Sequence, residues 1–284
     1  MNILEFTILI WLGSLVAGFL GGLTGLGGGV VIVPLLSLVF GVDIRYAIGA
    51  SLISVIATSS GAASAYVKEG YINMRIGMFL EIATTVGALV GAGLAARLSP
   101  DAVAVIFGVV LIGSAYSASR PRSVKQRPDK PDRIAAYLKF DGAFPGPDGQ
   151  GTMRSMVAYH VRGVPAGFSL MFAAGGLSGL LGIGSGALKV LAMDQAMRIP
   201  FKVSTTTSNF MIGVTAAASA GVYLNRGYID PGLAMPVVLG VLPGAMLATV
   251  FLKSTKSGIL RKIFAVVVVV LAVEMIYNGL TGRF

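Results

Sequence analysis

The sequence predicts an all-α membrane protein with several spans, built from two related helical repeats. Hydrophobic residues make up 55% of the 284 residues, charged residues only 12%, and the mean hydropathy is +0.83. The apolar residues gather in long runs, and the runs of the second half repeat those of the first. A water-soluble globule needs more polar surface than this composition supplies.

Charge and cysteine content exclude several classes of protein. The net charge is +10, but Lys and Arg lie in short connections between apolar runs, where the positive-inside rule places them. No basic stripe is interleaved with aromatics, so we expect no nucleic-acid partner. The chain has no cysteine, and its single histidine, His160, lies in a polar stretch. We therefore expect no metal site, no cofactor and no thiol or metalloprotease chemistry.

Ten apolar segments form two sets of five. The first run carries Glu5 and lacks a basic start, so we expect a membrane helix there and not a cleaved signal peptide. A polar, proline-rich stretch over 120–162 separates the sets and is expected to be a cytoplasmic linker loop. The domains are then 1–119, 120–162 and 163–284. The expected segments are 3–20, 30–40, 46–67, 75–97 and 101–119, followed by 163–181, 187–199, 203–224, 231–252 and 260–280.

The two sets align without a gap at a shift of 157 residues. The shift places Ser51 on Ser208 and Gly70-Tyr-Ile72 on Gly227-Tyr-Ile229. One register that holds from Gly22 to Ile72 indicates an internal repeat and not a chance match of glycine-rich sequence. Further matches are Gly22, Gly25, Gly27 and Gly29 with Gly179, Gly182, Gly184 and Gly186, and Thr58 with Thr215.

The second segment of each set is too short to cross a ~30 Å hydrocarbon core at ~1.5 Å per residue. It either folds back as the second arm of a hairpin or continues the first helix after a break. With the 120–162 loop in the cytoplasm, folding back places most of the remaining Lys and Arg inside, and continuing outward reverses this. The hairpin is favoured. It gives each half an odd number of crossings, so the repeats are expected to be inverted.

Glycine-rich breaks over 21–29 and 175–186 precede the two short segments. Non-helical backbone at membrane depth must be buried in protein or line a wet cavity. The helix that follows presents free N–H groups and a partial positive charge, which glycine leaves open to an anion. Close helix packing is the alternative explanation. Recurrence in both halves favours an anion site with Gly27, Gly28, Gly29, Gly184, Ser185 and Gly186.

Polar side chains open the third segment of each half, over 202–209 and 49–54. Hydroxyl and amide groups donate to an oxyanion without the cost of a buried charge. They also bond back to their own helix, and Ser204 is expected to cap its helix. Ser51 is a candidate substrate-binding residue. Both interpretations stay open for Thr206, Thr207, Ser208 and Asn209.

Ionisable residues inside apolar segments are candidate functional residues, because each costs at least ~2.5–3.5 kcal/mol at mid-bilayer. Lys189 is expected to attract the anion. Its alternatives are an ion pair with Asp194 or Glu81, or snorkelling to the interface. Glu81 is the candidate proton-coupling carboxylate.

These residues resemble the TauE/SafE family of anion exporters. The resemblance rests on Gly22–Pro34, repeated as Gly179–Val190, and on Pro200–Phe210 with the stretch ending at Asp230. It implies a multi-pass permease of a bacterial or archaeal inner membrane that carries sulfite, sulfoacetate or related organosulfur anions. The second motif departs from the first at Ser185, Lys189 and Leu191, where the first half has Gly28, Ile32 and Pro34.

The leading hypothesis is a secondary transporter, an exporter of a small anion that works by alternating access around a midplane site. Its partners are the anion and the lipid bilayer, and the oligomeric state stays open. A membrane enzyme would need a nucleophile–base pair or a metal cluster among the spans, and Ser185 with Lys189 is only a coincidence of spacing. A scaffold or regulatory subunit acting through the 120–162 loop is the alternative.

Overall fold

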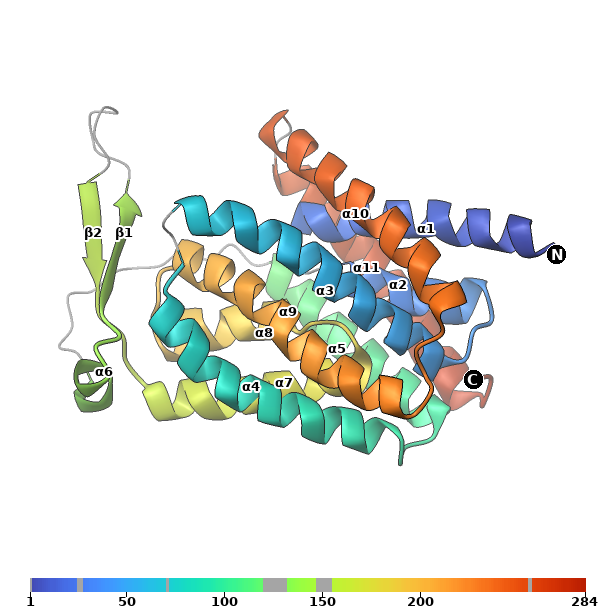
Figure 1. Ribbon diagram of the computed structural model, residues 1–284, viewed down its shortest axis with the longest axis horizontal. Coiled ribbons are helices and arrows are strands. Elements are labelled where there is room, and N and C mark those ends of the chain that lie inside the picture. Colours follow the sequence, from blue (N-terminus) through green and yellow to red (C-terminus); the bar gives the residue numbers. More distant parts are fainter. Residues whose placement is uncertain (1, 25–27, 70–71, 120–131, 147–154, 255–256) are drawn as a thin grey trace.

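The computed structural model describes residues 2–24, 28–69, 72–119, 132–146, 155–254 and 257–284. Long helices form a bundle, and a small unit of one short helix and two strands projects from one end (Figure 1). Four described helices are long and apolar enough to cross a membrane, over Ile3–Gly21, Met74–Ala95, Val164–Leu181 and Pro231–Ala248.

The elements follow the expected two sets of five with a linker between them. The first set is α1 (Ile3–Thr24), α2 (Gly29–Pro34), the π-helical turn η1 (Leu35–Val39), α3 (Ile44–Glu69), α4 (Met74–Ala95) and α5 (Pro100–Ser119). The linker holds α6 (Arg133–Tyr137), β1 (Gly142–Gly146) and β2 (Ser155–Tyr159). The second set is α7 (Val164–Leu181), α8 (Gly186–Leu191), the π-helical turn η2 (Ala192–Ala196), α9 (Phe201–Asn225), α10 (Pro231–Ser254) and α11 (Ser257–Leu280).

Short polar side chains fix where several of these helices begin. The Asn73 carboxamide oxygen accepts from the Ile76 N–H at 3.2 Å, and Ser99 Oγ accepts from the Ala102 N–H at 3.3 Å. The Asp230 carboxylate accepts from the Gly232 N–H at 2.7 Å. Each satisfies a donor that the first turn of a helix leaves free.

The element boundaries repeat at the same shift of 157 residues as the sequence. Helices α2 and α8 begin at Gly29 and Gly186, and each continues into a π-helical turn at the matching position. The starts of α3, α4 and α5 correspond in the same way to those of α9, α10 and α11. Even the left-handed residue that follows each π-helical turn is matched, with φ +64° at Gly41 and +55° at Arg198.

Each short segment folds back against the helix before it. The Arg162 N–H, just before α7, donates to the Met197 carbonyl just after η2 at 3.1 Å. In the first half the rings of Phe6 and Phe40 meet edge to face at 5.7 Å. Both contacts join the start of the long arm to the end of the short arm, so the folded-back alternative is the one that the structure has.

Glycines bring two helix pairs into close contact. A Cβ at Gly91 of α4 would overlap the Gly176 carbonyl of α7, and one at Gly244 of α10 would overlap the Leu15 carbonyl of α1. The expected breaks were therefore drawn too long. Helix α1 continues to Thr24 and α7 to Leu181, and Gly175 and Gly179 pack against α4, as the packing explanation predicts for them.

Helices α3 and α9 lie side by side at the centre of the bundle. In Figure 1 the chain colours show α3 running towards the end that carries β1 and β2, and α9 running away from it. These two helices are the counterparts of one another in the repeat.

The linker was expected to be a loop over 120–162, but part of it has regular secondary structure. Strands β1 and β2 pair antiparallel, with Gly142 opposite Tyr159. Phe140 and Tyr159 are buried, and the Phe140 ring packs on Phe79 of α4 at 5.2 Å. We call α6, β1 and β2 the end unit. Its apolar residues pack against the bundle. The proline and glycine content of the linker does not indicate this packing.

Candidate functional site

The two breaks meet inside the bundle. The Ser51 hydroxyl, from α3 of the first half, donates to the Gly182 carbonyl in the second break at 2.8 Å. A Cβ at Gly29 would stand 2.6 Å from that hydroxyl and 2.9 Å from the Gly182 oxygen. Both backbones thus come together at a buried serine.

The second break has a left-handed backbone at three positions. The φ angles are +68° at Gly182, +68° at Gly184 and +44° at Ser185. Glycine adopts this conformation freely, whereas a serine does so at a cost. A Cβ at Gly184 would also press on Ile212 at 2.9 Å. The break is therefore a defined turn with no room for side chains at its glycines.

The predicted polar residues of α9 have different partners. Ser208 faces the break, and its hydroxyl donates to the Gly186 carbonyl at 3.2 Å. Thr207 lies instead towards the start of α4, where its hydroxyl accepts from the Asn73 N–H at 3.2 Å. The Thr206 hydroxyl donates to the Lys202 carbonyl of its own helix at 2.9 Å, which is the second of the two interpretations left open for it. Asn209 is half-buried.

Ser204 does not cap its helix through a free N–H group. Its hydroxyl donates to the Ile199 carbonyl at 3.2 Å, ahead of the first turn of α9. Gly28 lies close to Val241 of α10, which a Cβ would approach to 3.1 Å. Gly27 lies outside the described residues.

A polar cluster in the bundle links the two halves through Lys189, Thr215 and Glu81. Lys189 of α8 has no exposed surface, and its ammonium donates to the Thr215 hydroxyl at 2.5 Å. That hydroxyl donates in turn to Oε1 of Glu81 at 2.6 Å. Of the alternatives weighed for Lys189, the association with Glu81 is observed, and Thr215 mediates it.

Two polar atoms near this cluster are buried and have no hydrogen-bond partner among the described residues. They are Oε2 of Glu81, a residue 8% exposed, and Oγ of Ser185, a residue 4% exposed. The Ser185 carbonyl accepts from the Lys189 N–H at 3.0 Å, so the free hydroxyl stands one helical turn before the lysine. Buried polar atoms are normally satisfied, so each exception calls for an explanation such as strain, a functional role or an ordered water or ion.

The cluster breaks the symmetry of the repeat. The positions that correspond to Lys189, Thr215 and Glu81 in the other half are Ile32, Thr58 and Val238. Ile32 is fully buried, and the Thr58 hydroxyl bonds back to its own helix. The same backbone arrangement is thus built once with an acid and a base and once without charge.

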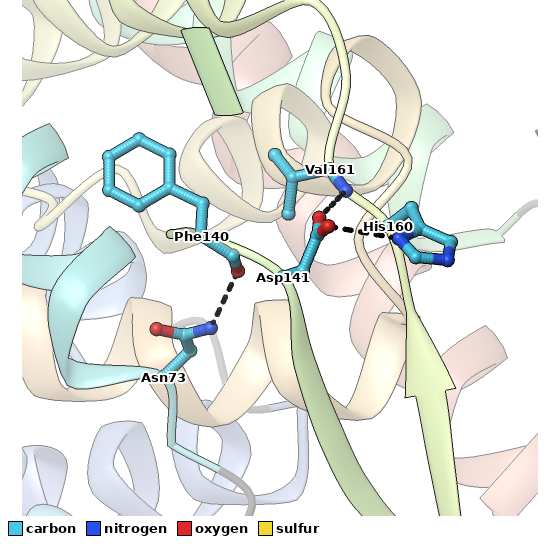
Figure 2. A network of polar contacts seen from close by, with 5 residues as sticks. All are labelled: Asn73, Phe140, Asp141, His160 and Val161. Atoms are coloured by element: carbon cyan, nitrogen blue, oxygen red, sulfur yellow. Dashed lines mark hydrogen bonds and ion pairs between the residues drawn. The ribbon is translucent and has the colours of Figure 1, made fainter. Parts of the chain in front are cut away.

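Sequence reasoning missed two residues of this arrangement. Thr215 was matched to Thr58 in the repeat but not proposed for the site, although it joins Lys189 to Glu81. Asn73 had no signal beyond its place before a helix. Its side chain donates to the Phe140 carbonyl of the linker at 3.2 Å, as Figure 2 shows, and its N–H donates to Thr207.

His160, expected to be a loop residue, follows β2 and contacts a carboxylate. Its Nδ1 lies 2.9 Å from Oδ2 of Asp141, while Oδ1 of the same carboxylate accepts from the Val161 N–H at 3.0 Å (Figure 2). These contacts join the residue before β1 to the residues after β2. Among the residues that the structure describes, no group of His, Asp and Glu is placed to hold a metal ion.

The comparisons with known proteins point to membrane transport. The model of the family described as sulfite exporter TauE/SafE matches residues 10–275. The chain is 29% identical to the probable membrane transporter protein YunE of Bacillus subtilis (strain 168), over 98% of this chain and 99% of the relative.

Two further relatives carry similar names. A probable membrane transporter protein of Xylella fastidiosa (strain 9a5c) is 24% identical over 98% of both chains. The probable membrane transporter protein MJ0441 of Methanocaldococcus jannaschii is 25% identical over 84% of this chain and 85% of its own. These names describe transporters and not enzymes. No solved structure matches the chain.

Proposed function

Because the chain belongs to the sulfite exporter TauE/SafE family, we propose that it is a secondary transporter that carries a small anion such as sulfite or an organosulfonate. Membership of the family and the names of the relatives make the protein a membrane transporter. The anion, the direction of export and the transport cycle belong to the proposal.

The observation that carries this proposal is the meeting of the two breaks at Ser51 and Gly182, with Lys189 buried one turn beyond Ser185. Backbone N–H groups at the start of a helix attract negative charge, and a buried ammonium adds to that attraction. Neither needs a second charged side chain in the bilayer. A small anion is the solute that this chemistry favours.

Alternating access is supported by the arrangement of the repeats. Helices α3 and α9 begin at positions related by the shift of 157 residues and run in opposite directions. We propose that the halves are inverted repeats and that the site lies where they meet. Rocking of one half against the other then opens the site to each side of the membrane in turn.

Flux into proteoliposomes tests this function. The purified protein is offered sulfite, sulfoacetate, sulfate and chloride. We expect selective sulfite or sulfonate flux that Gly186→Leu abolishes, because glycine leaves the first N–H groups of α8 open to an anion and leucine does not. Gly93→Leu is the matched control, since a Cβ at Gly93 has no neighbour within 4 Å.

The outcome that opposes transport is absence of flux for every anion from protein that stays monodisperse in detergent. The protein would then be assigned to the alternative, a membrane scaffold or regulatory subunit without solute flux.

A further inference from the structure

We propose that the cluster of Lys189, Thr215 and Glu81 binds one proton together with one monovalent anion, so that the protein carries the two as a neutral pair. This inference rests on the proposed transport function. It adds the charge class of the cargo and the identity of the coupling ion. Export of such a pair runs down an outward gradient of the anion, because an inward proton gradient drives the pair inward.

The hydrogen bonds of the cluster show which atom of Glu81 is available to a proton. A threonine hydroxyl has one proton. Thr215 accepts from Lys189 and donates to Oε1 of Glu81 at 2.6 Å, which is nearer than the Met211 carbonyl at 3.0 Å. Thr85 also donates to Oε1, at 3.2 Å. Oε2 is buried without a partner among the described residues. That oxygen is therefore the place on the carboxyl group where a proton can be held.

Charge balance couples the proton to the anion. Removing a net charge from water costs several kcal/mol even in a relaxed protein, so each buried state is held close to neutral. In the empty state, the ammonium of Lys189 balances the carboxylate of Glu81. A monovalent anion beside Lys189 adds one negative charge, and a proton on Glu81 cancels it. Each ligand then strengthens the binding of the other.

The same balance selects the charge of the cargo. A divalent anion would need a second proton, and the cluster has no second acid. The other charged or titratable residues of the packed elements α4, α5, η2 and α9 lie at the surface, at helix ends or in other contacts. They are Arg75, Asp101, Tyr116, Asp194, Lys202 and Tyr223. Arg75 donates to the Lys139 carbonyl, Asp101 accepts from the Phe284 N–H, and Tyr223 donates to the Leu180 carbonyl.

The matched positions of the repeat show that the fold does not require these charges. At the corresponding positions Ile32, Thr58 and Val238 occupy the same backbone arrangement. A buried acid and base that serve only stability would be a costly choice, because well-packed apolar residues stabilise as well or better. The pair is therefore retained for what it binds.

Proteoliposomes that hold the full-length protein provide the test, with methanesulfonate as the monovalent probe and sulfate as the divalent one. An inward proton gradient is expected to drive methanesulfonate accumulation, with about one proton per anion by a trapped pH dye. Clamping the membrane potential with valinomycin and K⁺ should leave the flux unchanged. Sulfate flux should be at least tenfold lower.

Two variants isolate the acid and the hydroxyl. Glu81→Gln mimics the protonated carboxyl, so methanesulfonate exchange should persist while proton-driven accumulation falls at least tenfold. Thr215→Val should weaken the coupling, whereas Thr58→Val, its counterpart in the repeat, should not. The double change Lys189→Ile with Glu81→Val introduces the residue types found at the matched positions Ile32 and Val238. This variant should fold but lose proton-driven accumulation.

Anion flux that follows the potential and ignores the proton gradient would overturn this inference and leave the transport function intact. So would proton-driven accumulation that survives Glu81→Gln. A binding measurement covers the case without flux. Methanesulfonate should raise the Tm of wild-type protein in detergent more at pH 5.5 than at pH 8, and equally at both for Glu81→Gln. Equal shifts in the wild type would contradict the inference.

Discussion

The carboxamide nitrogen of Asn73 donates a hydrogen bond of 2.7 Å to the hydroxyl of Tyr159, and so joins the start of α4 to the end unit. The same nitrogen donates to the Phe140 carbonyl at 3.2 Å, and the Asn73 N–H donates to Thr207 in α9. One residue thus connects the linker, the first half and the second half at one end of the bundle, through its side chain and its backbone N–H.

Tyr159→Phe should loosen the end unit. The change removes a hydrogen bond worth about 0.5–1.5 kcal/mol and leaves the Asn73 amide with one partner fewer. Trypsin cleavage after Arg133 and Lys139 should become roughly 2- to 10-fold faster when local opening limits cleavage. Tyr137→Phe is the control, because Tyr137 is 87% exposed. Equal cleavage of the two variants would contradict this role of Tyr159.

The same tyrosine makes the stability of the end unit depend on pH in the alkaline range. Burial raises the pKa of Tyr159 above its usual value, against the opposing effect of the Asn73 hydrogen bond. The neutral phenol therefore stabilises the folded form below the ordinary tyrosine pKa of about 10, and this contribution is lost as the pH rises through the higher folded value. Cleavage of the wild type should accelerate above about pH 10, more steeply than that of Tyr159→Phe.

Gly91→Ala should destabilise the bundle. Its Cβ would overlap the Gly176 carbonyl, which is backbone and cannot turn away, so α4 and α7 must separate. Overpacking of this kind costs about 1–3 kcal/mol. Thermal unfolding in detergent should show a lower Tm, and Gly93→Ala on the same helix should leave the Tm unchanged because its Cβ meets open space. A normal Tm for Gly91→Ala would show that the helices are further apart.

Ser51→Ala should impair transport more than stability. The change leaves the Gly182 carbonyl without its 2.8 Å hydrogen bond at the point where the breaks meet. An unsatisfied buried acceptor costs about 1–3 kcal/mol, enough to displace the second break. We expect anion flux to fall about tenfold, as a cost of ~1.4 kcal/mol in the transport barrier would give. Ser60→Ala, which removes an exposed hydroxyl of the same helix, should transport normally.

Single cysteines test the inverted arrangement, since the chain has no cysteine of its own. Tyr137 in α6 and Asn225 at the end of α9 are both exposed. Helix α9 has 25 residues, which is about 37 Å at the α-helical rise. A membrane-impermeant maleimide should label Asn225→Cys in intact cells and Tyr137→Cys only after the cells are opened. Labelling of both from one side would exclude the arrangement.

Much of the fold was predictable because membrane helices follow local rules. The apolar runs, the linker and the shift of 157 residues gave the segments, and the shift carried over to the element starts. The lengths of 30–40 and 187–199 left two alternatives, and the positions of Lys and Arg favoured the folded-back hairpins. The breaks were drawn too long because glycine serves both a turn and close packing. Only spatial contacts, such as Gly91 with Gly176, separate the two roles.

The positions of several candidate site residues could be predicted, but not the contacts that join them. Ser51, Ser208 and Lys189 were chosen from residue type and position, and the structure places them at or beside the breaks. Glu81 is 108 residues from Lys189 in the sequence, and nothing local indicates that Thr215 joins them. Such a link depends on how α4 packs against α9, which periodicity does not specify. The end unit was missed because its two strands are short and one contains Pro145.

The single lysine–glutamate junction has a consequence for how the molecule is assembled. Two identical half-length chains around a twofold axis would carry such a junction at both contacts or at neither. Joining the halves in one polypeptide removes that constraint, because each half then has its own sequence. Here Ile32 and Val238 leave one set of matched positions uncharged, while Lys189 and Glu81 place a base and an acid, joined through Thr215, at the other. Covalent linkage thus lets a nearly symmetric framework hold one charged centre.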